Sequence, residues 1–146
     1  MSSEIDAYPQ NNRAWERTHP DREASEEIFG LFGAGSHFHE QFGFYIDGVD
    51  ENTAKLPSDW LSRSKTSEWL DGAKKIRAIA PAIDDLIVSK LHRLEPKDRD
   101  YILACHARKK LNVTKIKRLF ATSGADAKTQ KAAFNFLDEL TPDPKS

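Results

Sequence analysis

The first part of the chain contains one segment with strand periodicity and one with helix periodicity. Ser3–Tyr8 alternates polar and apolar residues as a strand does, and residues 9–13 have the composition of a loop. Thr18-His19-Pro20-Asp21 predicts a helix start with Thr18 as its cap. An apolar stripe then predicts a short helix that Gly33 ends, formed by Ala24, Ile28, Leu31 and Phe32.

A second strand is predicted in the middle of the chain. Residues 33–41 are a small glycine-rich connection, and Phe42–Val49 has strand periodicity with Tyr45 and Asp47 on the same face. Residues 50–65 are polar, so we expect a loop there with a short extended piece.

A hairpin and a helical region complete the pattern. Residues 66–80 predict two strands joined by Asp71-Gly72, a dipeptide that favours two-residue turns. From Pro81 onward four apolar stripes predict four helices, the last capped by Asp126. We expect residues 1–80 to form a partial α/β core, residues 81–140 the helical portion of the same domain, and residues 141–146 a tail. The predicted fold class is α+β, an incomplete sheet with one helix followed by four helices.

Composition limits the function classes. At 146 residues the chain is one domain by length, and a net charge of −1 indicates no general affinity for nucleic acid or membranes. The single cysteine, Cys105, lies in a helical apolar pattern, which favours an inert core thiol in a reducing compartment. No apolar run approaches the roughly 18 residues of a membrane span, and the first residues lack a signal-peptide pattern. We therefore expect a soluble cytoplasmic protein.

Three acids are the first candidates for chemistry. Glu4 and Asp6 are two residues apart on a strand, so both carboxylates face the same side while Ile5 points toward the core. Asp47 would line a groove beside them if its strand is a neighbour. Such carboxylates can bridge divalent metals around a triphosphate. The alternative is that all three are solvated acids at strand edges or ends.

Lys90 and Asp98 form a second candidate pair. Lys90 falls near the middle of an apolar helical stripe, where an ammonium must either reach solvent or pair with an anion. Asp98, on the buried side of the next helix, is a natural partner. The alternatives are a lysine at the edge of the stripe and an acid that interacts with the helix dipole.

Three weaker patterns remain. Gly35-Ser36 followed by Asp47 and Asp50 resembles the spacing of a phosphate-binding loop, but the preceding segment is helical where a strand is required. His37-x-His39 lacks a third and fourth metal ligand, which favours loop histidines. Six basic residues without an acid lie between Arg108 and Arg118, a pattern typical either of phosphate-backbone binding or of a solvated helical face.

Several of these segments together resemble a bacterial nucleotidyltransferase-like family of unknown function, related to abortive-infection toxins of the AbiEii type. The matching segments are Ser3-Glu-Ile-Asp-Ala-Tyr, Gly43-Phe-Tyr-Ile-Asp-Gly-Val, Leu56-Pro-Ser-Asp-Trp-Leu-Ser-Arg, Asp85-Leu-Ile-Val-Ser-Lys-Leu and Pro96-Lys-Asp-Arg-Asp-Tyr-Ile. The last two are the most specific, and the resemblance covers roughly residues 2–105.

The resemblance implies a site in which acids hold Mg²⁺ and a nucleoside triphosphate. Glu4 and Asp6 match the paired acids, although the first is usually Asp, and Asp47 matches the third carboxylate. In the second half Lys90 matches a catalytic and phosphate-contacting lysine, with Lys97 and Asp98 as further cofactor-binding positions.

In the family, a strand, a Gly-Ser phosphate loop and a helix come before the paired acids. By this resemblance, all three should precede Glu4. This leads us to expect an N-terminal truncation, with Met1 an internal methionine of a longer reading frame, and little or no transfer activity in this form. An exposed sheet edge would also suit a homodimer.

Three hypotheses follow. The first is an enzyme that transfers a nucleotidyl group from a nucleoside triphosphate to RNA or protein, in toxin–antitoxin or phage-defence systems, with RNA or an antitoxin protein as partner. The second is a catalytically degenerate interaction or RNA-binding module that uses the basic stretch. The third is an active enzyme that uses Gly35-Ser36 with Asp47.

Overall fold

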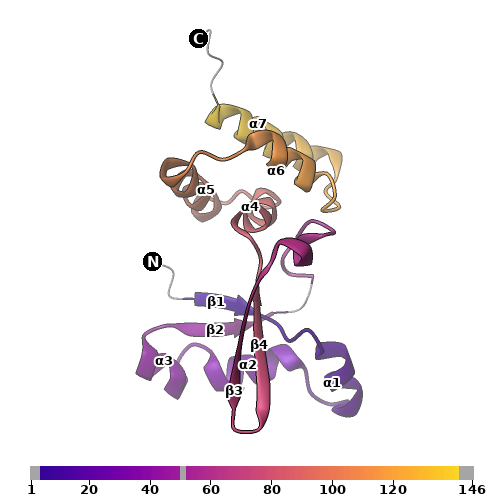
Figure 1. Ribbon diagram of the computed structural model, residues 1–146, viewed down its shortest axis with the longest axis vertical. Helices are drawn as coiled ribbons and strands as arrows, with labels where there is room; N and C mark the ends of the chain where they lie inside the picture. The colour runs from indigo at the N-terminus through magenta and orange to yellow at the C-terminus, as the bar shows by residue number, and fades with distance from the viewer. Residues whose placement is uncertain (1–3, 50–51, 142–146) are drawn as a thin grey trace. The chain divides into compact units, whose positions relative to one another are not determined.

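The computed structural model describes residues 4–49 and 52–141, which divide between Ala54 and Lys55 into two compact units (Figure 1). We call them the N-terminal unit and the C-terminal unit. Ser3, Asp50 and residues 142–146, which figure in the predictions above, lie outside the described residues. The α+β class is confirmed, because each unit contains helices and a two-stranded sheet.

The N-terminal unit is built around a pair of parallel strands. Its elements in order are β1 (Glu4–Ala7), α1 (Asn12–Thr18), α2 (Ala24–Phe32), α3 (His37–Phe42) and β2 (Tyr45–Gly48). Figure 1 shows the arrows of β1 and β2 side by side and pointing the same way. Their register places Glu4 opposite Tyr45 and Asp6 opposite Asp47. Both strands were predicted, with ends within a few residues of those observed.

The prediction of a single helix before β2 was wrong, because α1 and α3 lie partly in residues 9–13 and 33–41, which were read as a loop and a connection. Helix α3 is capped at its start by Ser36, whose hydroxyl accepts the His39 amide at 3.2 Å, and at its end by Gly43 in the left-handed conformation with φ of 76°. Its Phe38 ring lies 5.4 Å from the ring of Phe32 and 5.2 Å from that of Phe44. Aromatic packing therefore stabilises a helix too short to form alone.

The predicted cap of α2 was also wrong. Thr18 is the last residue of α1, and α2 begins six residues later. The side chain of Glu16 on α1 accepts the Ala24 amide at 3.0 Å, so a neighbouring helix satisfies the first amide of α2. This bond joins the two helices.

Helix α2 packs closely against β2. A Cβ atom on Gly48 would overlap the backbone of Ser25, with the Ser25 carbonyl oxygen as its nearest neighbour. Only glycine permits this approach of strand end to helix start. The close contact sets the position of the chain directly after Asp47.

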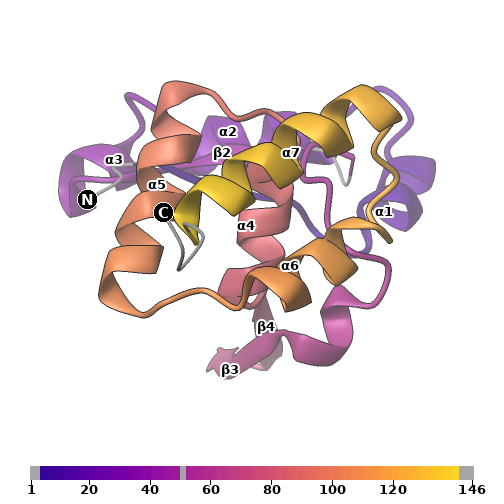
Figure 2. The same ribbon diagram turned by 90° about the horizontal axis from the view of Figure 1, so that it is seen from above.

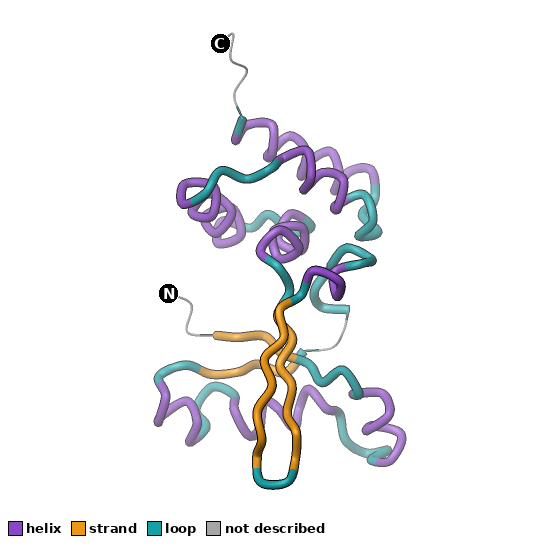
Figure 3. Tube along the Cα trace, in the orientation of Figure 1, coloured by secondary structure: helices purple, strands orange, loops and turns teal. Residues whose placement is uncertain are grey.

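The C-terminal unit begins with a short 3₁₀ helix, η1 (Trp60–Arg63), where a loop with an extended piece was predicted. The hairpin that follows is confirmed: β3 (Lys65–Asp71) pairs antiparallel with β4 (Lys74–Ala80) (Figure 3). Asp71 pairs with Lys74, so the turn residues are Gly72-Ala73, one position later than predicted. Gly72 has φ of 61°, which glycine adopts without strain.

Four helices form the rest of the C-terminal unit, as predicted. They are α4 (Ile83–Leu91), α5 (Pro96–Arg108), α6 (Val113–Phe120) and α7 (Ala127–Leu140), which Figure 2 shows from above. Asp126 caps α7 as predicted, accepting the Thr129 amide at 2.7 Å. Fully buried apolar side chains from all four helices make the core: Ile87, Leu91, Ile102, Ile116, Phe120 and Leu137. Cys105 is partly buried against this core.

A buried ion pair joins η1 to α4. Asp85 has no exposed side-chain surface, and Arg63 donates to both of its oxygens while also binding Asp59 at 2.7 Å. These bonds raise the pKa of the Arg63 guanidinium and lower that of Asp59. A buried carboxylate without such a partner would be strongly destabilising.

None of the described helices has both the length and the apolar character that crossing a bilayer requires.

The contact between Gly48 and Ser25 gives a stability prediction. Gly48→Ala forces a methyl group into the Ser25 backbone and should lower the free energy of unfolding of the N-terminal unit by about 3 kcal/mol or more. Gly30→Ala is the matched control, because Gly30 lies within α2 with open space around it and should stabilise by about 0.5–1 kcal/mol. Hydrogen exchange of β1 and β2 amides under native conditions reports both changes. Equal protection in the two variants would contradict the packing.

Candidate metal centre

The parallel register brings the three predicted acids together. Glu4, Asp6 and Asp47 each offer a carboxylate oxygen, and these oxygens all lie within 4.8 Å of one another. Opposed residues of paired strands share a face, which explains the convergence of positions 41 residues apart along the chain. Glu4 and Asp6 are exposed and Asp47 is half-buried, so the cluster is open to solutes.

The opposite face of β1 differs from the prediction. Ile5 was expected to point into a core, but 50% of its surface is exposed. The described sheet of this unit has two strands, so it provides little apolar cover for that face. Ile46, its register partner on β2, is half-buried.

Tyr45 is a neighbour of the acids to which the sequence assigned no role. Its hydroxyl donates to Oε2 of Glu4 at 3.2 Å, and its ring lies 5.0 Å from the ring of His39. Partial burial, the bond to Glu4 and the negative charges of Glu4, Asp47 and Asp6 all raise the pKa of Tyr45. Tyr45 thus stays protonated and serves as a hydrogen-bond donor. The signal available in the sequence was that it shares a face with Asp47.

The cluster has the chemistry of a site for a hard divalent cation. Carboxylate oxygens are the ligands that Mg²⁺ prefers, and the ion usually keeps several waters beside one or two carboxylates. Three like charges at this spacing repel one another, and a cation between Glu4, Asp6 and Asp47 would relieve that repulsion. The same spacing would let the carboxylates bridge two ions about 3.5–4 Å apart.

Lys90 and Asp98 contact each other within the C-terminal unit. Nζ of Lys90 lies 3.8 Å from Oδ1 of Asp98 and 4.6 Å from the ring centroid of Tyr101, and its side chain is 31% exposed. The lysine therefore both pairs with an anion and reaches solvent. Lys97 is exposed at the start of α5. Their predicted contacts with a nucleotide stay predictions.

Asp98 is buried and has closer partners than Lys90. Arg93 donates to both of its oxygens, at 2.8 and 2.9 Å, and the Glu95 amide donates at 3.1 Å as part of a capping box. The hydrogen bonds from Arg93 are the main cause that lowers the pKa of Asp98. The sequence did not identify Arg93, because it follows the helical stripe of α4 and lies in a connecting segment.

Comparison with protein families adds an independent observation. A family model described as nucleotidyltransferase of unknown function (DUF6036) matches residues 3–139. The chain belongs to this family. The match covers both units, including the three acids and the segment with Lys90 and Asp98. Neither the curated proteins nor the solved structures gave a match.

The weaker patterns have ordinary structural roles in this DUF6036 chain. Ser36 caps α3, so its hydroxyl is engaged by the helix, and the preceding element is α2 where a phosphate loop would follow a strand. His37 and His39 lie in α3 and not in a loop. The Gly35 amide donates to Nδ1 of His39 at 3.0 Å.

The basic stretch is divided by ion pairs. Lys115 binds Asp84 at 2.9 Å and Lys117 binds Asp138, both within the C-terminal unit. Arg108, Lys109 and Lys110 are exposed. Two lysines of the stretch therefore make ion pairs within the unit, and residues 108–110 form a smaller exposed basic segment.

The lowered pKa of Asp98 predicts an acid-labile contact. Because the folded pKa lies below the ordinary value of 3.8, the unfolded state binds the proton more readily. The stabilisation that Asp98 provides is present above the ordinary pKa of 3.8, and it is lost as the pH falls through the lower pKa of Asp98 in the folded chain. Asp98→Asn should therefore cost about 1–3 kcal/mol at pH 7 and less below about pH 4. Denaturant unfolding between about pH 7 and pH 3 measures this.

Asp100→Asn is the control for that experiment, because Asp100 is exposed on the same helix. It should leave both the stability and its pH dependence within about 0.5 kcal/mol of the parent chain. An Asp98→Asn chain that loses stability with acid as steeply as the parent would contradict the role of Asp98.

Proposed function

We propose that the chain is a Mg²⁺-dependent nucleotidyltransferase whose metal centre consists of Glu4, Asp6 and Asp47. The observation that carries the proposal is the convergence of these carboxylates in a chain of a nucleotidyltransferase family. The reaction class is attack of an acceptor hydroxyl on the α-phosphorus of a nucleoside triphosphate, with pyrophosphate as leaving group. The acceptor is RNA or protein.

Each residue of the proposed site has a role that suits its chemistry. Asp6 and Asp47, opposite each other in the register, would hold the cation, and Glu4 completes the ligand set. Bound Mg²⁺ would supply charge neutralisation and orientation for the triphosphate. Tyr45 donates to Glu4 and so orients its carboxylate. Lys90 and Lys97 are proposed phosphate contacts, for which a cationic side chain is suited.

The biological setting is part of the same proposal. The resemblance to AbiEii-type toxins supports a cytoplasmic role in toxin–antitoxin or phage-defence systems, with RNA or an antitoxin protein as partner. The narrow described sheet of the N-terminal unit supports homodimer formation through a strand edge. Sedimentation of the chain at several concentrations tests the dimer.

Metal binding is the direct test of the centre. Asp6→Asn/Asp47→Asn removes two of three ligand charges and should weaken Mn²⁺ or Mg²⁺ binding by at least about tenfold, a change of about 1.4 kcal/mol. Titration calorimetry and the paramagnetic resonance of Mn²⁺ both measure it. Magnesium-dependent binding of a nucleoside triphosphate should fall in parallel.

Glu40→Gln is the matched control, since Glu40 is an exposed acid of the same unit that lies outside the cluster. It should bind metal as the parent chain does. Equal affinity in the double variant and in the parent would sink the metal centre, and the chain would then fit the degenerate interaction module better.

A further inference from the structure

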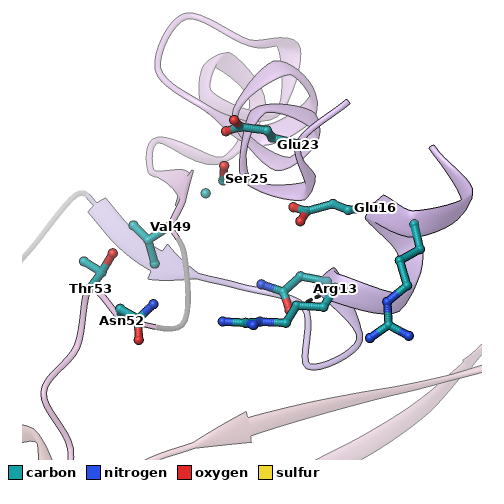
Figure 4. A pocket seen from close by; sticks show the side chains of 10 residues that line it. Arg13, Glu16, Glu23, Ser25, Val49, Asn52 and Thr53 are labelled. Carbon is teal, nitrogen blue, oxygen red and sulfur yellow. Dashed lines mark hydrogen bonds between the residues drawn. The ribbon is translucent and has the colours of Figure 1, made fainter. Parts of the chain in front are cut away.

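A pocket of about 830 Å³ lies in the N-terminal unit between α1, the start of α2 and the end of β2 (Figure 4). Its lining includes two arginines, two neutral polar residues and two acids: Arg13, Arg17, Asn12, Ser25, Glu16 and Glu23. Figure 4 shows Arg13 and Glu16 extending toward its interior from α1. The volume is in the range of small-molecule sites.

The pocket lies at the end of β2, the strand that carries Asp47. Gly48 directly follows Asp47, and the Val49 amide donates to the Ala7 carbonyl at 3.0 Å, which continues the pairing of the strands to this edge. The pocket therefore lies at the carboxyl ends of two parallel strands, the edge at which parallel sheets generally bind ligands.

Two arginines give the pocket its cationic wall. Arg13 and Arg17 are four residues apart on α1, so they lie on the same side of the helix, and both are exposed. A guanidinium presents five donors in a fixed fork, which suits bidentate bonds to phosphate. Asn12, which is 8% exposed, and Ser25 add neutral polar groups.

The acids of the pocket are arranged differently. Glu16 is engaged with the Ala24 amide, where its charge interacts favourably with the N-terminus of α2. Glu23 is exposed at the cap position of α2, and its side chain makes no capping bond. A negative ligand would be attracted to the arginines and repelled by Glu23, so the two substitutions should act in opposite directions.

We propose that this pocket binds phosphate groups of a nucleotide or oligonucleotide through Arg13 and Arg17. The site lies outside the acid cluster and goes beyond the proposed function. Its participation in transfer rests on that function, but its affinity for phosphate does not. The phosphates belong either to the nucleoside triphosphate or to a phosphate-bearing acceptor.

The first arm uses tripolyphosphate with a chelator present, so that no metal contributes. Arg13→Gln/Arg17→Gln should weaken its binding at least tenfold in titration calorimetry, and Glu23→Gln should strengthen it severalfold. Low ionic strength is needed, because salt screens exposed charges. Lys128→Gln/Lys131→Gln is the control, since these exposed lysines of α7 lie outside both the pocket and the basic stretch, and their substitution removes equal charge and should change nothing. Circular dichroism checks that each variant folds.

The second arm identifies the source of the phosphate. A double arginine variant that loses magnesium–ATP binding assigns the pocket to the triphosphate. A double arginine variant that still binds magnesium–ATP but no longer binds a 5′-phosphorylated diribonucleotide assigns the pocket to the acceptor. Unchanged affinity for all three probes, or weaker tripolyphosphate binding on Glu23→Gln, would overturn the proposal. Mn²⁺ titration of the same variants separates the two sites, because failure of the acid cluster alone leaves the tripolyphosphate result intact.

Discussion

The parallel pairing of β1 with β2 is the constraint on which the site depends. It places Asp6 opposite Asp47 and holds three carboxylates closer together than their mutual repulsion favours. The backbone ladder fixes the strands, and the absence of a side chain at Gly48 lets α2 pack against the end of β2. A single register therefore determines both the cation-binding chemistry on the strand face and the position of the polar pocket beyond the strand ends. A shift by one residue would send the acids to opposite faces.

Arginine–aspartate pairs organise the C-terminal unit in a different way. Two carboxylates, Asp85 and Asp98, are fully buried beside an apolar helical core, and each receives two or more hydrogen bonds from one guanidinium. Arg63 ties the 3₁₀ helix to α4, and Arg93 ties the connection after α4 to the start of α5. Buried pairs of this kind add little stability by themselves but strongly disfavour arrangements that leave one member alone. Lys90 lies at the edge of the second pair, with part of its side chain in solvent.

The sequence predicted the elements that carry a clear local period: both N-terminal strands, the hairpin and the four final helices. It missed α1 and α3, because each is shorter than eight residues and is held by contacts from outside itself. Glycines around α3 suggested a connection, whereas Gly43 in fact ends a helix and Phe38 packs it. The three acids could be named from strand periodicity. Their convergence could not, since parallel pairing across some 40 residues leaves no local signal. The pocket was missed because Arg13 and Arg17 lie on α1, a helix that the sequence did not predict.

The family model and the acid cluster are consistent with the same class of chemistry, in which carboxylates hold a divalent cation. The most direct test is anomalous diffraction from crystals of the chain grown or soaked with Mn²⁺. We expect an anomalous peak within about 2.0–2.3 Å of carboxylate oxygens from Asp6 and Asp47, absent from crystals of the Asp6→Asn/Asp47→Asn chain. Mn²⁺ bound elsewhere in the chain, with no peak between these two strands, would contradict it.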